Sequence, residues 1–160
     1  MKKMRKLLKN EKGLTLIELL AVIVILAIVA AIAVPAIGNI IQNSRDKAVF
    51  ADASTILSAA KLAMTDGACK KTAADTTGLT CDKDELKPYV EGITLATGDQ
   101  VVKTEATSSA DAIWTVTYSK LGNVSNTKFS VAADAANGIA AYTVGTTSIQ
   151  EKSLNKAMNQ

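Results

Sequence analysis

Residues 12–41 read KGLTLIELLAVIVILAIVAAIAVPAIGNII, and this stretch decides how the chain is built. Residues 19–37 carry no charged side chain, and a mostly apolar run of about 20 residues is what a helix needs to cross the roughly 30 Å hydrocarbon core of a membrane. Pro35 is the one residue foreign to a simple membrane helix. Because proline has no amide donor and clashes with the preceding turn, we expect a bend or local loosening there.

The charge pattern orients this segment. Six basic residues lie among residues 1–13, opposed by Glu11 alone, and the positive-inside rule places such a flank in the cytoplasm. The rest of the chain would then lie outside the cell. The 160-residue chain has a formal net charge of +3, but loss of residues 1–13 would leave 12 basic and 14 acidic residues, a net charge of −2. We therefore infer no direct nucleic-acid site from the basic balance of the whole chain.

The two cysteines, Cys69 and Cys81, lie close together in the polar half of the chain. An oxidising exterior compartment favours a disulfide between them, whereas two free buried thiols are the alternative. We expect no metal site, because two thiols alone bind metals weakly and the chain contains no histidine.

Beyond the proline the helical pattern resumes and becomes amphipathic. Apolar residues recur at helical spacing over residues 49–64, with polar residues between them. We expect one helix over residues 14–66, apolar along its membrane or assembly part (14–41) and amphipathic along the part that belongs to the head (42–66). Gly67 is its predicted C-terminal cap.

The remainder predicts a connecting loop and a small sheet. Residues 67–92 are polar and contain both cysteines, with a short helix expected over 82–90. Residues 93–160 follow as an antiparallel sheet and a polar tail that frays after Ser148. The amphipathic helix would cover one face of this sheet while its apolar half protrudes, which is an α+β fold. The expected strands are residues 113–118, 128–133 and, after the Asn137-Gly138 turn, 139–145.

A family resemblance rests on the N-terminal string. KGLTLIELL at residues 12–20, followed by the apolar run and Pro35, resembles the class III signal of type IV prepilins and pseudopilins. The resemblance implies that the basic leader is cleaved after Gly13 and that Leu14 becomes the methylated N-terminus. It places the family's glutamate at Glu18 and its frequent proline at Pro35, where helices loosen on assembly. Leu14 departs from the usual Phe or Met but is still a bulky apolar residue.

The same resemblance implies a function. We expect a structural subunit of a type IV pilus, held in the bacterial cytoplasmic membrane as a precursor and polymerised into a surface filament for adhesion, motility or DNA uptake. Its expected partners are identical or related pilin subunits, a prepilin peptidase, the membrane before assembly, and an assembly platform with a cytoplasmic ATPase. A pseudopilin of a type II secretion or competence machine would carry the same N-terminus and stays open as an alternative.

Physical principles also indicate a role for Glu18 in assembly. A carboxylate inside an apolar span is costly, by about 2.5 to 3.5 kcal/mol at a membrane centre and less near the edge. Cleavage would create an α-amino group at Leu14 that could pair with Glu18 of a neighbouring subunit, or of its own, and set the register of assembly. The alternative is that Glu18 lies at the membrane interface and reaches water.

Other classes of protein fit less well. An ordinary secretory signal has an apolar region of only about 7 to 15 residues and no reason to contain Glu18. An uncleaved, membrane-anchored surface binding protein stays open, and its N-terminus would be Met1. We expect neither enzymatic activity nor a cofactor, because histidine-based triads, a phosphate-binding glycine loop and a Gly-x-Ser-x-Gly motif are all absent from the sequence.

Overall fold

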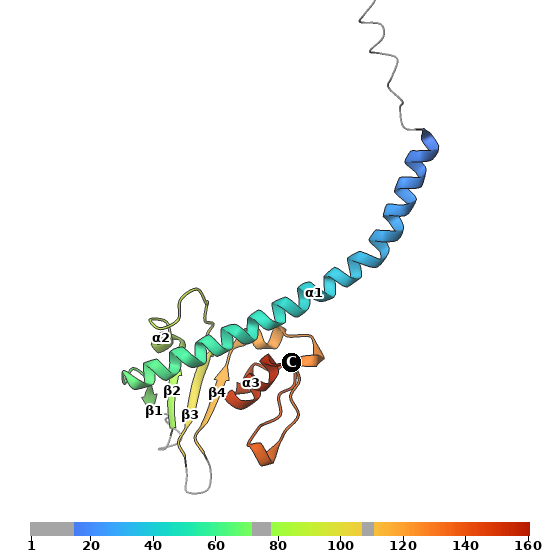
Figure 1. Ribbon diagram of the computed structural model, residues 1–160. Coiled ribbons are helices and arrows are strands. Elements are labelled where there is room, and N and C mark those ends of the chain that lie inside the picture. Colours follow the sequence, from blue (N-terminus) through green and yellow to red (C-terminus); the bar gives the residue numbers. More distant parts are fainter. Residues whose placement is uncertain (1–14, 72–77, 107–110) are drawn as a thin grey trace, which may run out of the picture. The chain divides into compact units, whose positions relative to one another are not determined.

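The computed structural model describes residues 15–71, 78–106 and 111–160 (Figure 1). The predicted leader, with its cleavage residues Gly13 and Leu14, lies outside the described residues. The chain divides into two compact units, Met1–Ile41 and Gln42–Gln160, which we describe separately.

One long helix, α1, runs from Leu16 to Thr65 and belongs to both units. Its C-terminal end confirms the predicted cap, since Gly67 has a φ of 73° and its amide donates to the Met64 carbonyl at 3.2 Å. The amide of Ala68 donates to the Ala63 carbonyl at 2.9 Å. These two bonds are the Schellman pattern, which satisfies carbonyls that the helix end would leave without donors.

The second unit, which we call the head, contains a five-stranded antiparallel sheet whose strands follow one another in sequence order. A row of buried residues crosses four of these strands through the pairs Cys81–Val101, Val101–Val116 and Val116–Ile149. Because side chains alternate along a strand, this row lies on one face of the sheet. The strands are β1 (Lys70–Lys71), β2 (Gly78–Asp82), β3 (Gln100–Thr104), β4 (Ile113–Thr117) and β5 (Ser148–Gln150).

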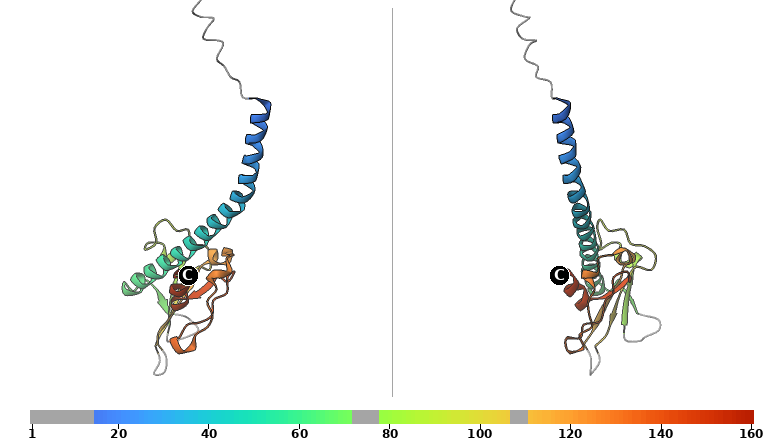
Figure 2. Two further views of the ribbon diagram at one scale, coloured as in Figure 1. Left: turned by 45° about the vertical axis from the view of Figure 1, so that its right-hand side comes forward. Right: turned by 90° about the vertical axis from the view of Figure 1, so that its right-hand side faces the viewer.

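The amphipathic half of α1 covers that face, as Figures 1 and 2 show. Cys81 Sγ lies 3.8 Å from the Ala60 carbonyl oxygen, which marks direct contact between the sheet and the helix. The predicted α+β arrangement is therefore confirmed for this unit. The residues that α1 buries here are Asp46, Phe50, Ala53, Ile56, Leu57, Ala59, Ala60 and Ala63.

Two predicted strands are wrong. Residues 128–133 contain the end of a 3₁₀ turn, η3 (Thr127–Phe129), and residues 139–145 contribute only the isolated bridges Val131–Tyr142 and Asp134–Ile139. Local side-chain bonds compete with the ladder: the Asp134 carboxylate accepts from the Asn137 backbone and side chain at 3.3 and 2.8 Å. The segment therefore folds back on itself as a loop.

The predicted loop of residues 67–92 is also wrong in part, because β1 and β2 lie within it. The short helix expected there is confirmed but is only four residues long, α2 (Lys83–Leu86). Its Asp82 N-cap and Glu85 form a capping box, in which the Asp82 amide donates to the Glu85 carboxylate at 2.8 Å.

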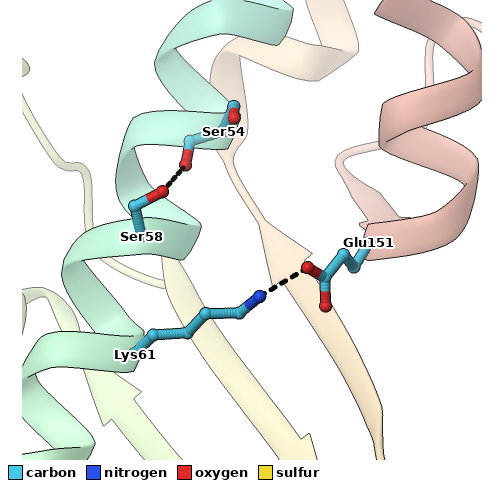
Figure 3. A network of polar contacts seen from close by, with 4 residues as sticks. All are labelled: Ser54, Ser58, Lys61 and Glu151. Carbon is cyan, nitrogen blue, oxygen red and sulfur yellow. Dashed lines mark hydrogen bonds and ion pairs between the residues drawn. The ribbon is translucent and has the colours of Figure 1, made fainter.

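The C-terminal tail does not fray. β5 leads directly into α3 (Glu151–Met158), which buries Leu154 and Ala157 in the same core as the sheet. Lys61 of α1 reaches Glu151 at the start of α3 with a nitrogen–oxygen distance of 2.5 Å (Figure 3). This pair joins the two helices across the sheet face that they share.

Aromatic side chains close the core near the start of the second unit. The Phe50 ring lies 5.2 Å from the Phe129 ring and 5.7 Å, edge-on, from the Tyr142 ring, measured between centroids. Tyr118 is buried, and its hydroxyl donates to Asp52 at 3.2 Å. Burial, aided by the nearby Asp52 charge, raises the pKa of Tyr118 well above its ordinary value, so the phenol stays protonated and can donate.

Candidate functional site

The apolar surface of the first unit is the most unusual feature of the chain. Large apolar side chains occupy most positions from Leu16 to Ile41, and between 47% and 85% of each is exposed. Because successive helix residues are about 100° apart, such a sequence is apolar on every side. This part of α1 is long and apolar enough to cross a membrane, and none of its most apolar window is buried within the chain.

Glu18 lies at the start of α1 and is held by Thr15. Its Oε2 accepts a hydrogen bond from the Thr15 amide at 2.7 Å and another from the Thr15 hydroxyl at 2.9 Å. In return, the Glu18 amide donates to the Thr15 hydroxyl oxygen at 3.3 Å. This reciprocal arrangement is a capping box, with Thr15 as N-cap and Glu18 as the third helical residue.

This box was not predicted, although Thr15-Leu16-Ile17-Glu18 matches its Ser/Thr-x-x-Glu signature. The capping box uses only one oxygen of the Glu18 carboxylate. The other, Oε1, has no hydrogen-bond partner among the described residues. An ionised carboxylate has about four acceptor sites, so a cation could bind at Oε1 while Thr15 keeps Oε2. Whether the Leu14 amine is that cation stays a prediction.

Pro35 lies inside α1, and the helix continues on both sides of it. Because Pro35 has no amide hydrogen, the carbonyl of Ala31 lacks the donor that an ordinary residue would supply. The helix is therefore not interrupted but has a weakened turn. Loosening of this turn on assembly stays a prediction.

The predicted disulfide between Cys69 and Cys81 is confirmed. It joins the segment after α1 to β2, where Cys81 is fully buried against the helix. The bridge closes a loop with a sequence separation of 12 residues. It therefore ties the end of α1 to the sheet.

Replacing both cysteines by alanine should destabilise the head. For a loop of this length, loss of the constraint on the unfolded chain costs about 3 kcal/mol. The double variant should therefore unfold at a lower urea concentration than the oxidised wild type. Reducing agent should lower the wild-type midpoint and leave the double variant unchanged; equal effects on both would contradict a stabilising bridge.

A second cross-link lies beside the disulfide. Lys70 of β1 forms an ion pair with Glu85 of α2, and 11% of the Glu85 side chain is exposed against 73% for Lys70. Hydrogen bonding to Lys70 lowers the pKa of Glu85, and the amide of Asp82 adds to the effect. Screening by water keeps the contribution small, because Lys70 is mostly exposed.

This pair predicts a pH dependence. A lowered pKa means that the pair stabilises the fold above the ordinary pKa of glutamate, about 4.3, and that this contribution is lost as the pH falls through the lower folded-state value. Urea midpoints of wild type and Lys70→Met should therefore differ at pH 7, and the difference should shrink as the pH falls below about 4.3. A difference that does not change with pH would show that Lys70 acts through packing.

The comparisons with known proteins agree with the N-terminal geometry. Residues 8–34 match the model of the prokaryotic N-terminal methylation motif. This motif is the class III signal of type IV pilins and pseudopilins, and the matched span includes Gly13, Leu14 and Glu18. No curated protein and no solved structure matches the chain. The N-terminal part of the chain is thus similar to that of type IV pilin and pseudopilin precursors, and its helix is long and apolar enough to anchor such a precursor in a membrane.

Proposed function

We propose that this chain is a structural subunit of a type IV pilus, which polymerises through the helix of residues 14–41 into a surface filament. The observation that carries the proposal is the apolar surface of residues 16–41, which is exposed on all sides of the helix. Such a surface is stable only in lipid or among similar helices. Membrane anchoring and helical polymerisation supply these two environments in turn.

The exchange from membrane to filament is physically reasonable. A helix that is apolar all round can leave lipid for neighbouring helices without exposing hydrocarbon to water. Subunits related by a head-to-tail operation that does not close would form an open helical polymer. The head, with its own core and disulfide, can keep its fold during this exchange because its buried residues are supplied by residues 46 onward.

Glu18 would give the polymer its register. In a low-dielectric filament core its open Oε1 would accept the α-amino group of Leu14, and a misplaced subunit would leave both charges without partners. We propose a structural role for the chain rather than catalysis. The prepilin peptidase and the ATPase-driven platform would supply the chemistry and the work of assembly.

A pseudopilin of a secretion or competence machine is the second candidate. It is favoured by the motif itself, which is common to pilins and pseudopilins. The two candidates differ in whether a long filament extends from the cell surface.

The test is mass analysis of the N-terminus in material sheared from the surface of the native host. A chain that starts at Leu14, with or without a methyl group, in long filaments supports the pilus. A Leu14 chain found only in membranes favours a pseudopilin or minor subunit. A chain that still starts at Met1 points to an uncleaved anchor and overturns the proposal.

A further inference from the structure

Four exposed cations lie on two segments of the head. Arg45 and Lys47 belong to α1, Lys120 to the 3₁₀ turn η2 (Ser119–Asn123) and Lys128 to η3. None of them forms an ion pair with a described residue. We call these four residues the basic end of the head.

Contacts with α1 bring the two segments together. The Asn126 amide, between η2 and η3, donates to Asp46 Oδ2 at 3.0 Å. The Phe129 ring at the end of η3 packs on the Phe50 ring, one turn further along α1. In both orientations of Figure 2 the orange segment that holds these turns runs beside α1. The basic end is therefore formed by tertiary structure and is not apparent in the sequence.

The neighbouring carboxylates form no ion pair with these cations among the described residues. Residues 44–52 contain two carboxylates, residues 118–130 contain none, and a third, that of Asp99, is buried and accepts from the Ser119 amide at 2.7 Å. Asp46 is only 2% exposed and accepts from Gln42 Nε2 at 2.7 Å as well as from Asn126. Asp52 is half-buried and bonded to the Tyr118 hydroxyl. The carboxylates thus face inward while the four cations face solvent.

The position of the basic end along the chain suggests its partner. Ile41 is the last exposed apolar residue of the first unit, and Arg45 and Lys47 follow it by four and six residues. Even fully extended, six residues span no more than about 21 Å. If the apolar segment is in a membrane, Arg45 and Lys47 therefore lie within about 21 Å of the point where it ends, on the side where phosphate groups of lipids are the nearest anions.

We propose that the basic end binds the anionic headgroups of the leaflet from which the head emerges, and so holds the head on the membrane until the subunit is assembled. The inference rests on the membrane-held stage of the proposed function. Attraction of this kind falls off within a Debye length, about 8 Å at physiological salt. Extraction into a filament would break these contacts, and anionic lipid would therefore slow release of the subunit.

The test is lysine acetylation of the full chain in nanodiscs made from phosphatidylcholine, with or without phosphatidylglycerol. Lys47, Lys120 and Lys128 should react about threefold more slowly in the anionic discs, because headgroups cover the amines. Lys71 and Lys87, which are also exposed, are internal controls and should react at equal rates in both discs. High salt should abolish the difference.

A pair of charge-reversed variants sharpens the test. Lys120→Glu with Lys128→Glu should remove the lipid-dependent protection of Lys47, whereas Lys71→Glu with Lys87→Glu should keep it. Equal labelling of the basic end in both discs would overturn the inference, as would protection found only in assembled filaments, which would assign the surface to a neighbouring subunit. Failure of the chain to enter either disc would instead count against the membrane-held stage of the proposed function.

Discussion

Replacing Glu18 by alanine should reduce the amount of surface filament by about 100-fold or more while leaving membrane insertion and leader cleavage largely intact. The reason is that the Leu14 amine would then enter the filament core without a partner. Removing one member of a buried ion pair costs about 3 to 5 kcal/mol, and each 1.4 kcal/mol is a factor of ten. The measurement is the yield of sheared filament, normalised to cleaved subunit in the membrane.

Glu18→Gln separates the two roles that the structure gives this side chain. Glutamine at this position can still complete the capping box with Thr15, but it carries no charge. If pairing with the amine sets the register, the glutamine variant should fail as the alanine variant does. Filaments from Glu18→Gln but not from Glu18→Ala would assign the role to the helix cap. Normal filaments from both variants would contradict a role for Glu18 in docking.

The sequence predicted the N-terminal half of the fold well because its signals are local. An apolar run, a C-terminal glycine and helical spacing each depend on neighbours within a few residues, and α1 was predicted to within two residues at both ends. The strand at Ile113–Thr117 was also predicted, since alternation within five residues defines it. The disulfide needed only the compartment and the proximity of two cysteines.

The C-terminal half was predicted poorly because its structure depends on distant partners. Ile149 is in a strand since it pairs with Val116, 33 positions earlier, and α3 is stable because Leu154 and Ala157 reach the common core. The polar tail shows no such signal by itself. Conversely, Tyr142 has the alternation typical of a strand but makes a single bridge, because Asp134 and Asn137 close a local turn instead.

The candidate site, like the fold, could be predicted from the sequence only in part. Glu18 was singled out because a lone carboxylate in an apolar run is visible in the sequence. Its bonds to Thr15 were not predicted although their signature is equally local, because the partner expected for Glu18 was the Leu14 amine of a neighbouring subunit or of its own. The basic end of the head could not be predicted, because Arg45 and Lys128 are 83 residues apart and only folding brings their segments together.

Phe50→Ala should cause a large loss of head stability. Phe50 is 1% exposed and lies against two other rings, Phe129 and Tyr142, so truncation leaves a cavity where helix, turn and loop meet. Substitutions of this kind cost about 3 to 5 kcal/mol, a large fraction of the roughly 5 to 15 kcal/mol that stabilises a typical domain. Urea unfolding of the full chain in detergent measures this cost, with Trp114, the single tryptophan, reporting on the head.

Leu62→Ala is the matched control, because Leu62 lies on the same helix but is 55% exposed. Its loss should change the free energy of unfolding by no more than about 0.5 kcal/mol. Equal destabilisation by the two variants would contradict the orientation of α1 on the sheet, since it would mean that both faces of the helix are packed. A large effect at Phe50 alone would show that the amphipathic half of α1 holds the head together, so that the helix that anchors the subunit also organises the domain it carries.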